Sequence, residues 1–259
     1  MQGIVASGNH SCPTVLLLHS SMSNARQWRE LVEALEPDYQ VINVDLLGYG
    51  RAPAADKHTG FSLQDEVERI EQAISDFSIQ RFHLVGHSYG GAVALKLAYE
   101  RPNSIASLIL FEPVAFHLLD KSHPGFAEVS ELGAVMPELS AEEAAQRFVD
   151  YWNGNGFFQS VSPSMQALFT RQVPKVALDF QALMNESYSF DDYAAIEAPT
   201  LLMSGKQTRE SARAVAEGLL QFQPQWRHLQ VSGGHMSPIS HTAEVNRPIL
   251  AWLEQHKAL

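Results

Sequence analysis

The chain has 259 residues, of which 45% are hydrophobic and 18% are charged, and its formal net charge is −11. These proportions are those of an ordinary globular protein, and the length suits one large domain or two small ones. The negative charge argues against nucleic acid or an anionic membrane surface as a partner.

The single cysteine, Cys12, excludes an intrachain disulfide and is compatible with a reducing compartment. The first residues show no basic segment followed by an apolar core, so we expect no secretory signal. The longest apolar runs have the length of a strand, well short of the ~20 residues that cross a bilayer. We therefore expect a cytoplasmic protein with no membrane partner.

Strands and helices alternate along the first part of the chain. Strands are expected over residues 14–19, 40–45, 82–85 and 105–111, and helices over residues 25–35, 62–77 and 92–98. The strands are continuous apolar runs, as in strands buried on both faces, while the helices carry apolar residues three and four positions apart. This alternation predicts an α/β protein with a mostly parallel, doubly wound sheet and helices on both faces.

The alternation breaks over residues 114–196, where helical patterns occur without a convincing strand. Ser140 with Glu143, and Ser162 with Pro163, are typical of helix starts. The alternation resumes with strands at 199–205 and 227–231, a helix at 210–221 and a closing helix that ends near 253. We therefore predict an α/β core made of residues 1–113 and 197–259, with residues 114–196 as a helical insertion.

The segment Val85–Gly91 reads VGHSYGG and places Ser88 between an apolar strand and a helix, in a G-x-S-x-G pattern. Such a nucleophile elbow holds a serine on a sharp turn at the end of a sheet strand. Gly86 and Gly90 fit this turn because strand and helix come too close there for side chains. The pattern predicts that Ser88 is a catalytic nucleophile, and the alternative is a glycine-rich turn with a buried serine.

Four features, in this order, resemble those of the α/β-hydrolase superfamily over nearly the whole chain. They are His19 after the first long strand, the turn DLLGYGR at 45–51, the elbow around Ser88, and Gly234-His235 after the last strand. The resemblance implies the α/β-hydrolase fold, with residues 114–196 as a helical cap over the site. Because this fold hosts many activities, it does not select a substrate.

A serine hydroxyl needs a base to remove its proton, and an imidazole is suited to this task near neutral pH. Among eleven histidines, His235 alone follows the last strand in a glycine-rich loop, so we predict it as the general base. His19 is expected to brace its loop, and His83 and His87 are expected to be structural. Asp45 is expected to organise the turn that follows it.

The third member of the triad departs from the family pattern. The family's usual aspartate position falls at about Thr208, which cannot carry a negative charge. We predict Glu112, at the end of the strand next in sequence after the elbow strand, because charge beside an apolar run is costly unless it is paired. Glu210 is the main alternative acid, and Asp191 and Asp192 are weaker ones.

The resemblance also implies an oxyanion hole built from two backbone N–H groups. One belongs to Tyr89, directly after the nucleophile, and the other is expected from Ser21 in the loop after His19. The hydroxyl of Ser20 or Ser21 is expected to cap the helix at 25–35, with donation to the site as the alternative.

We therefore expect a cofactor-independent serine hydrolase, similar to a carboxylesterase, that acts on a small or medium acyl compound such as an ester, thioester or lactone. Neither a metal-ligand spacing nor a phosphate-binding loop is present, so no metal or nucleotide cofactor is expected. The alternatives are a carbon–carbon bond hydrolase with the same triad and a non-catalytic ligand-binding or receptor protein. The apolar cap residues either line an acyl pocket or only pack the cap: Phe116, Trp152, Phe157 and Phe158.

Overall fold

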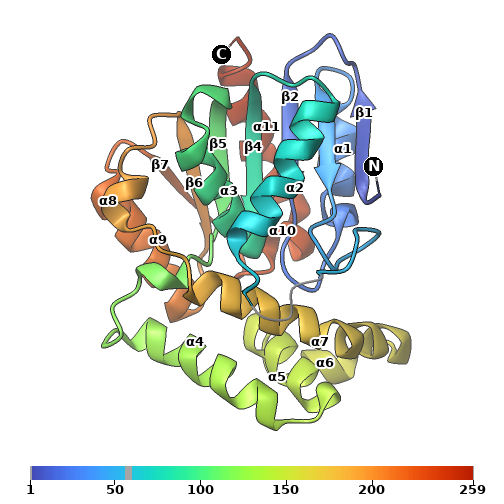
Figure 1. Ribbon diagram of the computed structural model, residues 1–259, viewed down its shortest axis with the longest axis vertical. Coiled ribbons are helices and arrows are strands. Elements are labelled where there is room, and N and C mark those ends of the chain that lie inside the picture. Colours follow the sequence, from blue (N-terminus) through green and yellow to red (C-terminus); the bar gives the residue numbers. More distant parts are fainter. Residues whose placement is uncertain (1, 56–59, 259) are drawn as a thin grey trace.

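The computed structural model describes residues 2–55 and 60–258. Within these residues the chain forms a seven-stranded sheet of order β1-β3-β2-β4-β5-β6-β7 (Figure 1). The strands are β1 (Ile4–Gly8), β2 (Thr14–Leu18), β3 (Gln40–Val44), β4 (Phe82–His87), β5 (Ile105–Phe111), β6 (Thr200–Gly205) and β7 (Arg227–Val231). Strand β1 pairs antiparallel with β3, and the remaining pairs are parallel, which confirms the predicted α/β fold class.

Helices cover both faces of this sheet. One face carries α2 (Leu63–Asp76), α3 (Tyr89–Glu100) and α9 (Glu210–Phe222), and the other carries α1 (Arg29–Leu35) and α11 (Thr242–Gln255). Short helices complete this part of the chain: η1 (Ala25–Trp28), η2 (Pro102–Ser104) and α10 (Ser237–Ser240).

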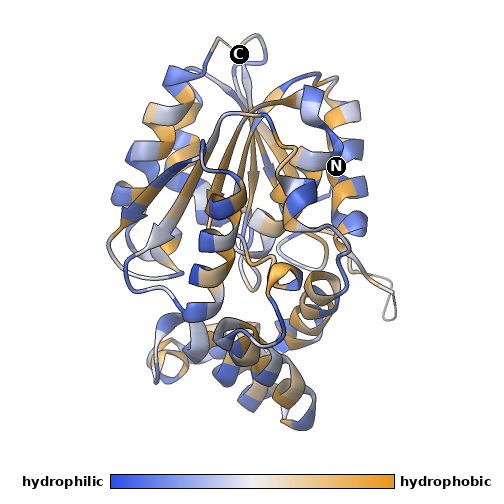
Figure 2. Cartoon of the chain, turned by 90° about the vertical axis from the view of Figure 1, so that its left-hand side faces the viewer, coloured by the Kyte–Doolittle hydropathy of each residue, from blue (hydrophilic) through white to orange (hydrophobic). Residues whose placement is uncertain are grey.

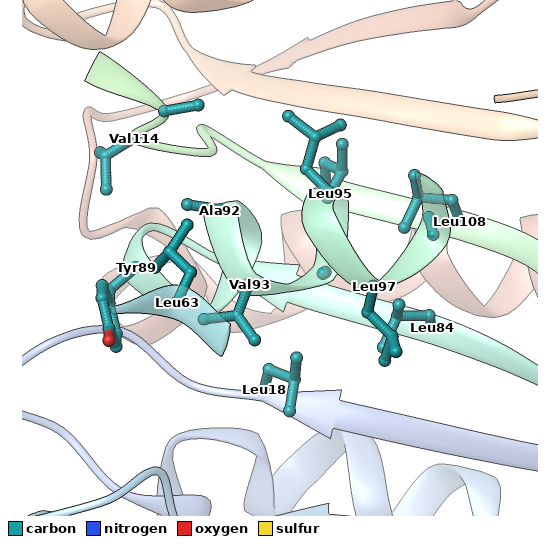
Figure 3. Close-up of a cluster of buried hydrophobic side chains, with 14 of the residues drawn as sticks. Leu18, Leu63, Leu84, Tyr89, Ala92, Val93, Leu95, Leu97, Leu108 and Val114 are labelled. Carbon is teal, nitrogen blue, oxygen red and sulfur yellow. The ribbon is translucent and has the colours of Figure 1, made fainter. Parts of the chain in front are cut away.

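The two faces follow from the alternation of side chains along each strand. On β2, Leu16 and Leu18 join the core beneath α2 and α3, whereas Val15 and Leu17 join the core beneath α1 and α11. The inner strands are accordingly hydrophobic along most of their length, whereas the edge strand β7 is largely polar and the helices show mixed colouring (Figure 2). Side chains of α3 reach the sheet in the close-up of the first core, where Val93 lies near Leu18 (Figure 3).

Residues 114–196 add a helical layer beside the ends of the strands (Figure 1). The helices are η3 (Phe116–Leu118), α4 (Pro124–Val135), η4 (Met136–Glu138), α5 (Ala141–Asn153), α6 (Phe157–Ser160), α7 (Pro163–Met184) and α8 (Phe190–Tyr193). Ser140 and Ser162 cap α5 and α7, as their sequence patterns predict. Helix α8 packs against α3 and α9 rather than within this layer. The division into core and cap at residues 114 and 196 stays a prediction.

The expected capping role of Ser20 and Ser21 is wrong. The helical segment that begins at Ala25 is capped by Asn24, whose side chain accepts from the Arg26 N–H at 3.0 Å. The Ser20 hydroxyl donates to the Gln27 side chain at 2.9 Å, and the Ser21 hydroxyl donates to Asp179 at 2.6 Å. Asn24 is adjacent to the helix, so its short side chain reaches the first free N–H groups more directly.

Across the described ranges, no helix has both the length and the apolar character that a bilayer crossing requires.

Candidate active site

The elbow places Ser88 between β4 and α3 in a backbone conformation that L-residues rarely adopt, with φ 57° and ψ −121°. Such a conformation costs about 1–3 kcal/mol and persists where the surroundings enforce it. The two glycines make the close packing possible. A Cβ at Gly86 would lie 2.5 Å from the Gly90 carbonyl oxygen, and one at Gly90 would lie 2.4 Å from that of His19. The turn therefore holds the Ser88 side chain at the end of the sheet strand.

Ser88, His235 and Glu112 form one continuous chain of hydrogen bonds. His235 Nε2 lies 2.8 Å from Ser88 Oγ, and His235 Nδ1 lies 2.7 Å from Glu112 Oε2. All three residues are buried. A carboxylate only accepts hydrogen bonds, so Nδ1 carries the hydrogen and Nε2 is left to accept from the serine hydroxyl. This arrangement fits a serine nucleophile, a general base and an orienting acid.

Glu112 lies at the end of β5 and is fully buried. Its side chain accepts hydrogen bonds from the Gly205 N–H and from the Thr208 hydroxyl, each at 2.7 Å, besides the one from His235. These donors compensate for the loss of water around a buried carboxylate. The residue also has a positive φ of 42°, with its own N–H bonded to the Met203 carbonyl at 3.0 Å.

The alternative acids from the sequence analysis make their contacts away from His235. Glu210 begins α9 and forms a 3.3 Å ion pair with Arg213 in which both side chains are partly exposed. Asp192 completes the capping box of α8 by accepting hydrogen bonds from the N-cap residue Ser189, and Asp191 lies beside it in the same short helix. Of the carboxylates proposed from the sequence, the structure therefore brings Glu112 to the imidazole.

His87, inside the elbow, forms a hydrogen bond with the backbone of the general base, His235. Its Nε2 donates to the His235 carbonyl at 2.9 Å, and its ring lies edge-on to Phe111. Burial, reinforced by the neighbouring His235, holds the pKa of His87 well below its ordinary value. His87 therefore stays neutral at physiological pH, which agrees with the structural role expected for it.

Trp152 of α5 covers the imidazole from the cap side. Its ring is stacked on that of His235, with centroids 3.8 Å apart and planes 28° from parallel. An indole face stabilises a nearby cation by about 0.5–2 kcal/mol, so this contact favours the imidazolium that forms when the base takes a proton. The sequence pattern identified Trp152 as a cap residue but carried no signal for this stacking.

The loop after β2 is braced by His19, as expected. Its Nδ1 donates to the Ser20 carbonyl at 2.7 Å, and its Nε2 accepts from the Leu46 N–H at 2.9 Å. Burial lowers the pKa of His19 to about 4, so the ring is neutral. Asp45 organises the neighbouring turn by accepting from the N–H groups of Ala25 and Arg51, at 2.7 and 2.8 Å.

The two expected oxyanion-hole residues lie beside Ser88. Tyr89 is the first residue of α3, where backbone N–H groups lack an acceptor within the helix. Ser21 shares with Ser88 the lining of the adjoining cavities. Its hydroxyl is directed at Asp179, which leaves the backbone N–H as the donor that Ser21 can offer.

A buried cluster of charges ties α7 to the core next to Ser21. Lys175 lies 3.1 Å from Glu66 of α2 and also contacts Asp179 one turn along α7. Asp179 accepts hydrogen bonds from the Tyr49 hydroxyl at 2.5 Å and from Ser21 at 2.6 Å. Burial raises the pKa of Glu66; it also disfavours charge on Lys175, but the two carboxylates outweigh this and raise its pKa. The sequence pattern gave no indication of this cluster.

A cavity of about 350 Å³ opens over Ser88 and His235. Apolar side chains of the cap form much of its wall: Phe148, Val149, Trp152, Phe157, Met165 and Leu168. Trp152 and Phe157 thus line the site, which is one of the two roles that the sequence left open for them. Phe116 lines a smaller inner cavity, whereas Phe158 is fully buried in the packing of the cap. Among residues 2–55 and 60–258, no cluster of three or more acidic, histidine or cysteine side chains is placed to hold a metal ion.

A family model described as "Alpha/beta hydrolase family" matches residues 15–247. The chain is 29% identical over 255 residues to the "Putative carbamate hydrolase RutD" of Variovorax paradoxus, a match that takes in 94% of this chain and 92% of that protein. It is 35% identical over 111 residues to the "Probable lysophospholipase BODYGUARD 1" of Arabidopsis thaliana.

That second match takes in 40% of this chain and spans only 24% of the plant protein. Among solved structures, the enol-lactonase from Burkholderia xenovorans matches with a TM-score of 0.80 and 17% identity, over 97% of this chain and 95% of that one. At such identity the likeness shows the fold alone.

Proposed function

The chain belongs to the alpha/beta hydrolase family, and we propose that it is a cofactor-independent serine hydrolase acting on a carbonyl carbon that bears a leaving group. The observation that carries this proposal is the chain of hydrogen bonds from Ser88 through His235 to Glu112, with distances of 2.8 and 2.7 Å. A ligand-binding protein would not require a serine, a base and a carboxylate in this order.

In the first half of the reaction, Ser88 Oγ attacks the carbonyl carbon while His235 Nε2 takes the hydroxyl proton. Glu112 holds the imidazole in the required tautomer and stabilises its positive charge. The backbone N–H groups of Tyr89 and Ser21 are assigned to the oxyanion. His235 then gives the proton to the leaving group, and an acyl-serine ester remains on Ser88.

In the second half, a water molecule enters beside His235 and gives it a proton as its oxygen attacks the acyl carbon. The same N–H donors stabilise the second tetrahedral intermediate. His235 returns the proton to Ser88 Oγ as the acid product leaves, so the enzyme ends in its starting state. One water is consumed, and no cofactor is needed.

The substrate class proposed is a small or medium ester, thioester or lactone. The names of two relatives support attack at an acyl carbon, since they describe a putative carbamate hydrolase and a probable lysophospholipase. The largely apolar cavity over Ser88 suits an uncharged, partly hydrophobic substrate. We propose such a small molecule as the physiological partner.

Steady-state hydrolysis of p-nitrophenyl butyrate tests the proposal. We expect turnover by the wild type and a loss of about 10⁴-fold or more in Ser88→Ala, since serine and base act as a unit. Ser240→Ala is the matched control, because Ser240 is exposed and lines the same cavity without touching the triad. Equal activity of Ser88→Ala and the wild type would refute the proposal.

A further inference from the structure

Phe180 of α7 stands between the catalytic serine and a second, larger cavity in the cap. It lines the inner cavity beside Ser88, and it also lines a cavity of about 630 Å³ between α4 and α7. The ring is stacked on Phe116 with centroids 6.4 Å apart and lies edge-on to Phe148 at 6.2 Å. A Cβ added at Gly133 of α4 would lie 3.3 Å from this ring, so Phe180 packs directly on the α4 backbone.

The position of the general base, His235, indicates which cavity receives the leaving group of a substrate and which receives its acyl group, here called the acyl arm. In the proposed reaction His235 protonates the leaving group and later activates water, so both must approach from its side. His235 lines the outer cavity over Ser88 but not the inner one. The leaving group and the water therefore use the outer cavity, and the acyl arm extends into the inner one.

The inner cavity limits this acyl arm. It has a volume of about 10 Å³, enough for about one water molecule. Apolar side chains dominate its wall, among them Val114, Phe116, Val176 and Leu183. With the side chains in these positions, only a short acyl group fits into the inner cavity beyond Ser88. Phe180 forms part of the wall that blocks a longer acyl group.

Helix geometry explains why Phe180 serves both cavities. Successive residues on a helix are rotated by about 100°. Val176 and Leu183 lie on the face of α7 turned toward Ser88, whereas Val173, Ala177 and Met184 lie on the face turned toward the larger cavity. Phe180 falls between these two faces, at their shared edge.

The larger cavity has the chemistry of an acyl-chain site. Its lining is mainly apolar: Leu119, Phe126, Val129, Met136, Val173 and Met184. His117 is also in the wall, and burial lowers its pKa to about 4, so the ring carries no charge at neutral pH. Lys121 is exposed, which keeps its charge in water. Aliphatic chains gain about 0.8 kcal/mol for each buried methylene group, so such a lining favours a long chain.

We propose that Phe180 is a specificity-determining gate whose side chain turns aside to let the acyl chain of a long-chain ester pass from Ser88 into the cavity between α4 and α7. This inference rests on the proposed function and extends it from small and medium acyl groups to long ones. No covalent step is added, since the gate acts on the acyl arm before attack.

Filling the cavity tests the gate. Ala177 is exposed on α7 and lines the cavity, so Ala177→Trp narrows it without disturbing buried packing. We expect kcat/KM for p-nitrophenyl laurate to fall about tenfold or more, as lost burial of a few methylene groups implies. The value for p-nitrophenyl butyrate is expected to stay nearly unchanged. Ala127→Trp, exposed on α4 and outside the cavity lining, is the matched control and should leave both substrates unaffected.

A second variant tests the gate from the other direction. Phe180→Ala removes the ring and should raise the ratio of laurate to butyrate kcat/KM, a ratio that does not depend on the folded fraction. The inference is overturned if Ala177→Trp leaves laurate hydrolysis intact or lowers both substrates equally, if Phe180→Ala lowers the ratio, or if the wild type cleaves butyrate but not laurate. Failure of the wild type to cleave either ester would instead count against the proposed function.

Discussion

Thr208 donates its hydroxyl hydrogen bond to Glu112 Oε2 at 2.7 Å. The same oxygen lies 2.7 Å from His235 Nδ1, so threonine and imidazole share one carboxylate oxygen. Glu112 follows β5 and Thr208 follows β6, and these strands are neighbours in the sheet. Thr208, which lies near the family's usual acid position but carries no charge, thus donates a hydrogen bond to the carboxylate of Glu112, which the adjacent strand supplies.

Removal of this hydroxyl should weaken catalysis without removing the triad. A hydrogen bond to a charged group contributes about 1.5–3 kcal/mol, so we expect kcat of Thr208→Val to fall about 10- to 100-fold. Thr208→Ser keeps the donor and should retain most of the activity. Steady-state kinetics on p-nitrophenyl butyrate gives both values, and equal kcat for the valine and serine variants would rule out this role.

The two candidate acids, Glu112 and Glu210, can be compared by replacing each with glutamine and measuring kcat. Glu112→Gln keeps the shape of the side chain but favours the wrong imidazole tautomer, so we expect kcat to fall by about 10⁴-fold. Glu210→Gln alters an exposed ion pair with Arg213 and should leave kcat nearly unchanged. The same ester assay measures both, and near-normal turnover by Glu112→Gln would show that another group orients His235.

The positions of Ser88, His235 and Glu112 could be anticipated because each follows a recognisable strand. Parallel strands bring their carboxyl ends to one edge of the sheet, so residues far apart in sequence meet there. The pattern around Ser88 also predicts its strained turn, since it places glycines on both sides. Their catalytic roles remain proposals that the observed hydrogen bonds support.

Contacts made by the cap could not be anticipated in this way. The Ser21 hydroxyl was expected to cap a nearby helix, yet it bonds to Asp179, 158 residues away. The stacking of Trp152 on His235 and the pairing of Lys175 with Glu66 depend on how α5 and α7 sit over the sheet. Helical periodicity shows which face of a helix is apolar, but it does not specify the partner of a buried charge.

The buried charges between α7 and the core should matter greatly for stability. Lys175→Met leaves Glu66 and Asp179 without their cation, and breaking such a buried pair costs about 3–5 kcal/mol. Urea denaturation followed by circular dichroism measures this loss in the free energy of unfolding.

Lys257→Met is the matched control, because Lys257 pairs with Asp38 and Glu254 at the surface. An exposed pair contributes about 0–1 kcal/mol, so little change is expected. Equal losses in the two variants would contradict a structural role for the buried cluster.

Stability should fall as the solution becomes acidic. Burial lowers the pKa values of His19, His83 and His117 to about 4 in the folded protein. In the unfolded chain these imidazoles take up protons near their ordinary pKa of about 6.5. Between these values the unfolded state binds more protons, so the free energy of unfolding decreases as the pH falls.

Each of these three histidines contributes at most about 1.4 kcal/mol per pH unit to this decrease. Urea denaturation at pH 7 and at pH 5 measures the sum, and His117→Gln should make the dependence shallower. Unchanged or greater stability of the wild type at pH 5 would be inconsistent with buried, neutral imidazoles.

An activated serine at the elbow is the central claim, and labelling with a fluorophosphonate probe tests it most directly. The probe forms a covalent bond with a serine whose proton is removed by a neighbouring base, and peptide mass spectrometry then locates the adduct. We expect one adduct on Ser88 in the folded wild type, loss of labelling in Ser88→Ala, and strongly slowed labelling in His235→Gln. Folded wild-type protein that reacts at another residue, or not at all, would contradict the proposal that Ser88 is the nucleophile.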